Sequence, residues 1–240
     1  MPTILIGLDD TDNQTSPGTG SLARSLCTEF QKHGMTPAGI TRHQFLLDPA
    51  IAYTSHNSGA CIAVETDQGI DALSFAFEFV ARRSAPGSDP GLCIAQTEAV
   101  SPAVIQFANA AVLRVLQMKD AFSLALASSI RLHGLGGLCS GVIGALAAVG
   151  LRAEGASGRF IDLPGLRELS GRVNAADFTN LAIAIKHRID DRPPLPTDLY
   201  DTMNWVRPNL VNGRPVLTVE WSEQTDAWIP VDRKKDRPLE

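Results

Sequence analysis

The feature that most constrains this chain is a short apolar strand that runs directly into a cluster of carboxylates. Residues 3–8 read Thr-Ile-Leu-Ile-Gly-Leu, a run typical of a buried strand. Asp9, Asp10 and Asp12 follow at once, which places three carboxylates within four residues. Like charges this close repel one another unless water or a cation surrounds them. Because α/β sheets bind ligands at the carboxyl ends of their strands, this loop is the first candidate site.

The acidic loop has several chemical interpretations. Clustered oxygen ligands suit Mg²⁺, which keeps some waters and bridges to substrate phosphates, so we predict that Asp9, Asp10 and Asp12 bind this metal. A solvated loop without a ligand is the alternative. An EF-hand is excluded, because the loop lacks the central glycine and the terminal glutamate. An Asp-x-Asp-x-Thr phosphatase motif fits in part, since Gln14 stands where Thr or Val is expected.

A glycine-rich turn, Gly18-Thr19-Gly20-Ser21, follows the carboxylates and leads into an amphipathic helix that ends before Gly34. A helix N-terminus offers free N–H groups and the positive end of the helix dipole, so the turn predicts a phosphate site. The other interpretation is that Thr19 or Ser21 only caps the helix. Both interpretations can hold together.

A second glycine loop opens another predicted helix, with the sequence Gly136-Gly137-Leu138-Cys139-Ser140-Gly141. It is not a dinucleotide fingerprint, because Cys139 takes the place of the third glycine, and Val142 replaces the lysine of a Walker A loop. As a phosphate-binding loop it would complement the first. The candidate residues are Gly136, Gly137, Ser140 and Gly141.

The turn before a predicted strand at residues 60–65 reads His56-Asn57-Ser58-Gly59. A His-Asn pair at a turn either caps the backbone or makes a polar contact to a ligand. We include these four residues among the candidate nucleotide-binding residues.

Hydrophobic periodicity predicts an alternating α/β organisation for the rest of the chain. The long helical stretch would break at Lys119-Asp120, and Gly150 would end the helix that follows the second glycine loop. Asn212-Gly213 is a strong hairpin signal. The predicted elements are strands at residues 38–42, 60–65 and 92–95, helices at 70–81, 101–130 and 142–149, a linker or rigid turn at 192–196, and the hairpin at 206–221.

Composition excludes several functional classes. Hydrophobic residues make up 44% of the 240 and charged residues 20%, which excludes intrinsic disorder. A net charge of −5 argues against a broad basic face that binds phosphate backbones. The four cysteines show no zinc-ligand spacing and are expected to be reduced. Since no targeting or membrane segment is visible, we expect a cytoplasmic protein with no membrane partner.

The strand, the carboxylates and the first glycine turn together resemble the N-terminal signature of the archaeal tRNA-Ile 2-agmatinylcytidine synthetases. Three further stretches are similar to that family and follow in the same order. They are residues 47–60, which include Asp48-Pro49 and the turn at 56–59, the turn Ser88-Asp89-Pro90-Gly91, and residues 141–150, which read Gly-Val-Ile-Gly-Ala-Leu-Ala-Ala-Val-Gly.

The resemblance implies an α/β (α+β) fold in which a kinase-like nucleotide-binding domain carries an inserted ferredoxin-like domain. The kinase-like, ATP-binding domain would be discontinuous and comprise residues 1–59 and 130–190. The ferredoxin-like domain would comprise residues 60–129 and 197–230. Residues 231–240 would form a flexible tail.

The resemblance also implies ATP chemistry. In that family ATP is split twice: a hydroxyl residue of the glycine turn is phosphorylated, and a cytidine of the tRNA anticodon is activated for attack by agmatine. The phosphorylated threonine of the family falls on Ser21 here. Asp9, Asp10 and Asp12 would hold Mg²⁺–ATP, and the two glycine turns would enclose its phosphates.

The family proteins also carry an OB domain and a zinc ribbon that bind tRNA. This sequence has no zinc-ligand spacing and places Leu138-Cys139 where the family has a basic residue. We therefore expect a Mg²⁺-dependent, ATP-using phosphotransferase or ligase that acts on a small-molecule acceptor, and we do not expect tRNA as a partner unless another protein supplies RNA binding. The alternatives are a nucleotide-binding regulatory protein without turnover and an RNA-modifying enzyme with a separate RNA-binding partner. A homodimer is left open.

Overall fold

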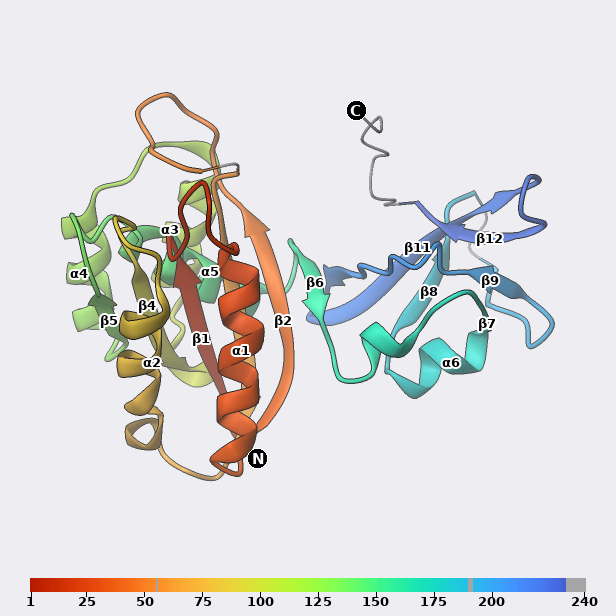
Figure 1. Ribbon diagram of the computed structural model, residues 1–240, viewed down its shortest axis with the longest axis horizontal. Coiled ribbons are helices and arrows are strands. Elements are labelled where there is room, and N and C mark those ends of the chain that lie inside the picture. The colour runs from red at the N-terminus through yellow and green to blue at the C-terminus, as the bar shows by residue number, and fades with distance from the viewer. Residues whose placement is uncertain (55, 190–191, 232–240) are drawn as a thin grey trace.

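The computed structural model describes residues 1–54, 56–189 and 192–231. These residues form two lobes that share one 12-stranded sheet (Figure 1). The first lobe contains β1 (Thr3–Asp9), α1 (Thr19–Lys32), β2 (Thr36–Gln44), β3 (Ser58–Glu65), α2 (Phe75–Arg83), β4 (Gly91–Gln96), α3 (Pro102–Leu113), α4 (Met118–Ala127), β5 (Arg131–Gly134) and α5 (Val142–Glu154). The second lobe contains β6 (Arg159–Asp162), β7 (Arg172–Asn174), α6 (Ala175–Asn180), β8 (Ala184–His187), β9 (Leu199–Asp201), β10 (Asn209–Val211), β11 (Arg214–Ser222) and β12 (Ala227–Pro230).

The sheet of the first lobe has the strand order β5-β4-β1-β3-β2, and each neighbouring pair is antiparallel. Side chains alternate between the two faces of a strand. Ile4, Ile6 and Leu8 of β1 therefore pack with α1 and α2, whereas Leu5 and Gly7 face the side of α5. The central strand is thus covered by helices on both faces (Figure 1), and its carboxyl end opens toward the loops that carry the acidic cluster.

Helix α5 lies very close to the sheet because glycines line the contact. A Cβ on Gly7 would overlap the carbonyl oxygen of Ala145, and a Cβ on Gly91 in β4 would overlap the backbone of Gly141. The helix is buried over residues 144–151. This close approach fixes the N-terminal end of α5 against the carboxyl end of β1.

The second lobe continues the same sheet. β6 pairs with β2 of the first lobe and with β10 of the second, and β11 pairs with β10, β12 and β8. Its own small core contains Phe178, Tyr200, Leu217 and Val219. The two lobes therefore have separate cores but are joined through main-chain hydrogen bonds at β6.

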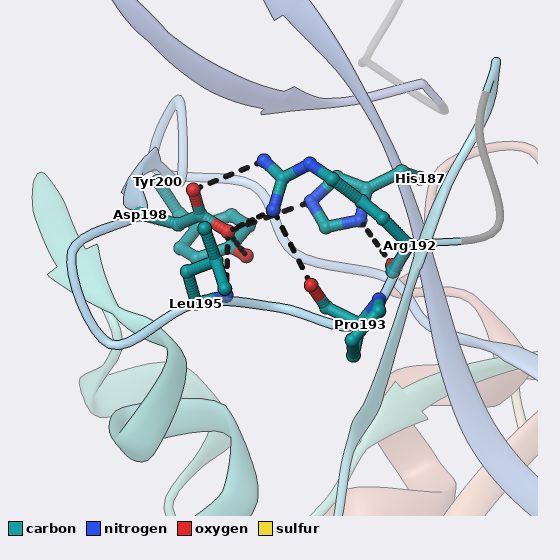
Figure 2. Close-up of polar contacts among 6 residues, drawn as sticks. All are labelled: His187, Arg192, Pro193, Leu195, Asp198 and Tyr200. Atoms are coloured by element: carbon teal, nitrogen blue, oxygen red, sulfur yellow. Dashed lines mark hydrogen bonds and ion pairs between the residues drawn. The ribbon is translucent and has the colours of Figure 1, made fainter.

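A polar cluster fixes the proline-rich stretch of the second lobe (Figure 2). Arg192 donates two hydrogen bonds of 2.9 and 3.0 Å to Asp198, and the N–H of Leu195 donates to the same carboxylate at 2.7 Å. The Arg192 hydrogen bonds lower the pKa of Asp198. The buried His187 at the end of β8 places Nδ1 3.1 Å from the carbonyl oxygen of Arg192. The predicted linker is therefore tied to the core of this lobe.

The structure corrects two helix boundaries. Residues 101–130 contain two helices, but the break lies at residues 114–117 and not at Lys119-Asp120. α5 does not end at Gly150, as the sequence suggested, but runs to Glu154 and is capped by Gly155, whose φ of 73° is the left-handed conformation common at helix ends. Gly150 instead allows α3 to approach, since a Cβ there would lie 2.5 Å from the Cβ of Ala108.

The predicted hairpin is confirmed. β10 and β11 flank Asn212 and Gly213, whose φ angles of 49° and 75° fit a tight hairpin turn. The other strands of the second lobe were not predicted, because β6, β7, β8, β9 and β12 contain only three or four residues each. Such short runs give too little alternation to be recognised in a sequence.

The mixed α/β class is confirmed, with a large sheet in which β8 and β11, and β9 and β12, pair in parallel. The division into a kinase-like and an inserted ferredoxin-like domain stays a prediction. In the sheet, β3 and β4 of the predicted ferredoxin-like domain pair with β1 of the predicted kinase-like domain. Residues 197–230, which were assigned to the same domain as β3 and β4, lie in the other lobe. Residues 232–240 of the predicted tail lie outside the described residues. Within the described ranges, no helix combines the length and apolarity needed to cross a membrane.

The close contact between β1 and α5 predicts that a larger side chain at position 7 lowers the stability of the fold. Gly7→Ala should destabilise the fold by about 1–3 kcal/mol or more, because the added methyl group must displace the backbone of α5. Gly69→Ala is the matched control, since nothing lies within 4 Å of a Cβ at that position. Denaturant unfolding of both variants tests this. Equal stability of the two variants would show that α5 is not packed as tightly as described.

Candidate functional site

Residues from four segments line a cavity at the carboxyl end of β1: 9–12, 45–54 with 56–58, the turn that carries Asp89, and 138–141. Together with α3 and the start of α5 they enclose a volume of about 330 Å³. Its lining combines acidic groups with apolar side chains. The acidic residues are Asp9, Asp10, Asp12 and Asp89, and the apolar ones include Phe45, Ile51, Tyr53, Leu116 and Ile143.

Asp9 is the carboxylate that lies deepest at this site. It is the last residue of β1, and a Cβ on Gly144 in α5 would overlap its Oδ2 atom. Burial, together with the negative charges of Asp10 and Asp12, raises the pKa of Asp9 to about 8. The carboxyl group is therefore mostly protonated at neutral pH unless a cation lies beside it.

Asp10 and Asp89 are linked through the hydroxyl group of Ser140. Its Oγ lies 3.0 Å from Oδ2 of Asp89 and 3.5 Å from Oδ2 of Asp10. Burial and then the charge of Asp89 raise the pKa of Asp10. Asp10 also has a φ of 51°, a conformation that non-glycine residues rarely adopt. The local backbone thus holds two like charges near one hydroxyl group.

The second glycine loop is built around Asp89. The N–H of Leu138 donates to Oδ1 of Asp89 at 2.7 Å, and a Cβ on Gly137 would overlap that same atom. Ser140 and Gly141 line the cavity, but Gly136 and Gly137, although described, are not among its lining residues. Their role in phosphate binding stays a prediction, and their contacts here are with the turn that carries Asp89.

Asp12 is separated from the other carboxylates by its hydrogen bonds. Its Oδ1 accepts from the hydroxyl of Thr19 at 3.0 Å, and its Oδ2 accepts from the hydroxyl of Thr54 at 3.3 Å. In the part of the chain that the structure describes, no three His, Cys, Asp or Glu side chains form a metal-binding group. The predicted triad of Asp9, Asp10 and Asp12 is therefore not preassembled around one point.

The donor set nevertheless fits Mg²⁺ in its usual coordination. This ion typically takes one or two protein carboxylates and fills its other positions with water and substrate phosphates. Asp9, Asp10 and Asp89 offer only hard oxygen atoms, and the raised pKa values of Asp9 and Asp10 mark a place where negative charge lacks compensation. Asp89 was not among the predicted site residues, although it lies in one of the stretches that carried the family resemblance.

The first glycine turn places its two hydroxyl groups differently. Thr19 begins α1 and is buried, and its hydroxyl also accepts a hydrogen bond of 3.0 Å from that of Thr11. The N-cap position is Gly18, which makes no side-chain cap hydrogen bond. The interpretation of Thr19 or Ser21 as the N-cap is therefore wrong, and Ser21 lines a second cavity.

The second cavity has a volume of about 280 Å³ and is lined by the start of α1. It shares Asp12, Thr54, His56 and Ser58 with the first cavity, so the two cavities adjoin. Of the predicted residues it is also lined by Gly18, Thr19, Gly20, Ser21 and Gly59. Three arginines that were not among the predicted site residues also line it, namely Arg24, Arg42 and Arg207.

The turn at residues 56–59 therefore contributes to both cavities. Asn57 also has a structural role, because its Nδ2 donates to the carbonyl oxygen of Leu46 at 2.7 Å. Its own carbonyl oxygen accepts from the N–H of Phe45 at 2.8 Å. These two hydrogen bonds close the base of the loop between β2 and β3, which carries Thr54 to Asp12.

The raised pKa of Asp9 predicts that the free energy of unfolding depends on pH. An aspartate in an unfolded chain titrates near about 3.9, so between that pH and about 8 the native state binds more protons and its stability falls as pH rises. Asp9→Asn should remove this loss and raise the free energy of unfolding at pH 8 by on the order of a few kcal/mol. Denaturant titrations at pH 5 and pH 8 measure it, with the exposed Asp67→Asn as control. An unchanged pH slope in Asp9→Asn would contradict the assignment.

Comparison with known proteins gives structural neighbours only. No protein-family model matches the chain, and no curated protein matches it significantly. Apo TiaS, a tRNA-Ile agmatidine synthetase, has a TM-score of 0.54 and 24% identity over 62% of this chain and 35% of its own. A tRNA fluorescent labeling enzyme has a TM-score of 0.54 and 27% identity, and the complex of TiaS with its tRNA and ATP has 0.54 and 26%, each over 62% of this chain and 36% of its own.

These neighbours agree with the resemblance found in the sequence. This chain spans about a third of the length of the solved structures that it matches, because the aligned part covers only 35–36% of them. The chain is thus similar in structure to tRNA-Ile agmatidine synthetase over 62% of its length, consistent with a TiaS-like N-terminal part.

Proposed function

We propose that this protein is a Mg²⁺-dependent enzyme that uses ATP for phosphoryl transfer or ligation. The observation that carries the proposal is the first cavity, in which Asp9, Asp10 and Asp89 lie beside an apolar lining. Apolar walls suit a nucleotide base, and buried carboxylates suit the metal ion that accompanies its phosphates. A structural neighbour was solved in complex with ATP and a tRNA, which supports the proposal that this chain also binds ATP.

The residues of the chain have distinct roles in this proposal. Asp9 and Asp10 would hold Mg²⁺, which when bound offsets charge on the phosphates during transfer. Asp89 and Ser140 would position Asp10, since the hydroxyl of Ser140 lies between the two carboxylates. Asp12 would orient Thr19 through their hydrogen bond. Catalysis of this kind depends mainly on positioning and on charge stabilisation.

Two classes of acceptor fit this chemistry. A small molecule remains our first candidate. The expectation from the sequence that tRNA is excluded without a partner protein has no support from the neighbours, since one of them was solved with a tRNA bound. An RNA acceptor is therefore the second candidate, and that neighbour is the observation that favours it.

The proposal predicts the loss of turnover in carboxylate variants. Asp10→Asn and Asp12→Asn should each lower Mg²⁺-dependent ATP turnover by about 100-fold or more. The first variant removes a negative charge that would hold Mg²⁺, and the second weakens the hydrogen bond that orients Thr19. The measurement is phosphorus NMR of ATP, with intact mass spectrometry on the same sample and Asp67→Asn as control. Normal turnover in Asp10→Asn would reject the assignment. ATP binding by the wild type without any product, with each candidate acceptor present, would favour a regulatory nucleotide-binding protein.

A second prediction separates the two hydroxyl groups of the glycine turn. Thr19→Val should lower the free energy of unfolding by about 1–3 kcal/mol, because Asp12 loses a hydrogen-bond donor. Ser21→Ala removes no cap hydrogen bond, so stability should stay close to that of the wild type. If Ser21 carries the phosphoryl group, as the resemblance implies, this variant should lose both turnover and a phosphoryl adduct in intact mass spectra. An unchanged adduct in Ser21→Ala would remove Ser21 from the mechanism.

A further inference from the structure

The second cavity is basic, although the chain as a whole is acidic. Its arginines come from distant elements: Arg24 from α1, Arg42 from β2 and Arg207 from the segment before β10. Asp12 is the acidic residue in its lining, and both carboxylate oxygens of Asp12 already accept hydrogen bonds from Thr19 and Thr54. The cavity therefore gathers three guanidinium groups against one carboxylate.

The cluster of positive charge extends beyond the lining. Burial, followed by the charges of Arg42, Arg167, Arg24 and Arg159, lowers the pKa of Arg207 to about 10. The pKa of Arg24 is lowered by burial and by Arg167, with Asp162 acting in the opposite direction. Asp162 itself lies 3.6 Å from Nε of Arg167. Asp162 offsets part of the charge of Arg24 and Asp12 part of that of Arg42, whereas the charges acting on Arg207 are all positive, so the region around Arg207 favours a bound anion.

Two of the three guanidinium groups are already held in place. Nε of Arg42 donates to the hydroxyl of Ser58 at 2.8 Å, and the guanidinium of Arg207 stacks over the ring of Trp205 at 4.1 Å from its centroid. Groups positioned in advance lose less conformational freedom when a ligand binds. The first turn of α1 faces the same cavity and contains no acidic residue, so its positive dipole end adds to the field.

We infer that the second cavity binds a phosphate group of the acceptor substrate, which makes the acceptor a phosphate-bearing molecule. The inference rests on the proposed function. Planar guanidinium groups pair with phosphate oxygens in a bidentate manner, and the cavity of about 280 Å³ has room for a phosphate group together with further atoms of the molecule that carries it. Because the two cavities share Asp12, Thr54, His56 and Ser58, an acceptor anchored here would lie next to a nucleotide in the first cavity.

Inorganic phosphate is the probe for the first experiment. Isothermal titration calorimetry should show phosphate binding to the wild type, and Arg24→Gln and Arg207→Gln should each weaken it by about 10-fold or more. Arg83→Gln is the matched control, since Arg83 also stacks on an aromatic ring, 5.0 Å from the centroid of Phe79, but lies outside the cavity. Thermal unfolding confirms that each variant is folded. Equal phosphate affinity in the wild type and both variants would overturn the inference.

A second titration separates this site from the nucleotide site. With a non-hydrolysable ATP analogue at saturation, phosphate should still bind and should still depend on Arg207. Displacement of phosphate by the analogue would overturn the inference, because the arginines would then belong to the ATP site. Phosphate binding needs no turnover, so a protein that binds phosphate at these arginines but never consumes ATP would reject the proposed function and leave the phosphate site in place.

The source of the phosphate is decided by competition. Ribose 5-phosphate represents a small phosphate ester, and a short single-stranded RNA represents a polynucleotide backbone. Displacement of inorganic phosphate by the ester, lost in Arg207→Gln, supports a small acceptor. Displacement by RNA alone, again lost in Arg207→Gln, supports an RNA acceptor. Displacement by neither would contradict a phosphate-bearing acceptor.

Discussion

The close contact between α5 and the central sheet is the constraint on which the rest of the site depends. Gly7 and Gly91 remove the side chains that would keep the helix away, and Gly144 leaves space for the carboxylate of Asp9 beneath it. A helix this close takes water away from Asp9, and burial is the largest cause of its raised pKa. The packing that completes the core therefore also creates the uncompensated acidic group. A cation at that point would therefore stabilise the fold.

Asp12 organises the boundary between the two cavities. Its hydrogen bonds to Thr19 and Thr54 join the start of α1 to the loop between β2 and β3. Asp12 and Thr54 line both cavities, one of which contains Asp9 and Asp10 and the other the arginines. A carboxylate engaged in this way is poorly placed to serve only as a metal ligand. It is better placed to separate the acidic first cavity from the basic second cavity and to fix their relative positions.

Local patterns made part of this structure predictable. β1, the acidic loop and α1 follow from consecutive residues, so their order and the cavity beside them could be expected from the sequence. Asp89, Thr54 and Arg207 could not, because they reach the site from distant segments and only tertiary packing brings them there. Gly150 shows a different limit. A glycine in a helical run can end the helix or allow a neighbour to approach, and the sequence does not separate these uses.

Net charge proved to be a poor guide to the local field. A formal charge of −5 argued against a surface for phosphate backbones, and that argument concerns a broad face. The second cavity needs only a few guanidinium groups, and it obtains them where β6 and the segment before β10 meet the first lobe. The field inside a cavity depends on which charges the fold brings within a few ångströms, since water screens the others. The second lobe therefore does more than extend the sheet, because it contributes Arg207 and so gives the region beside the acidic cavity its positive charge.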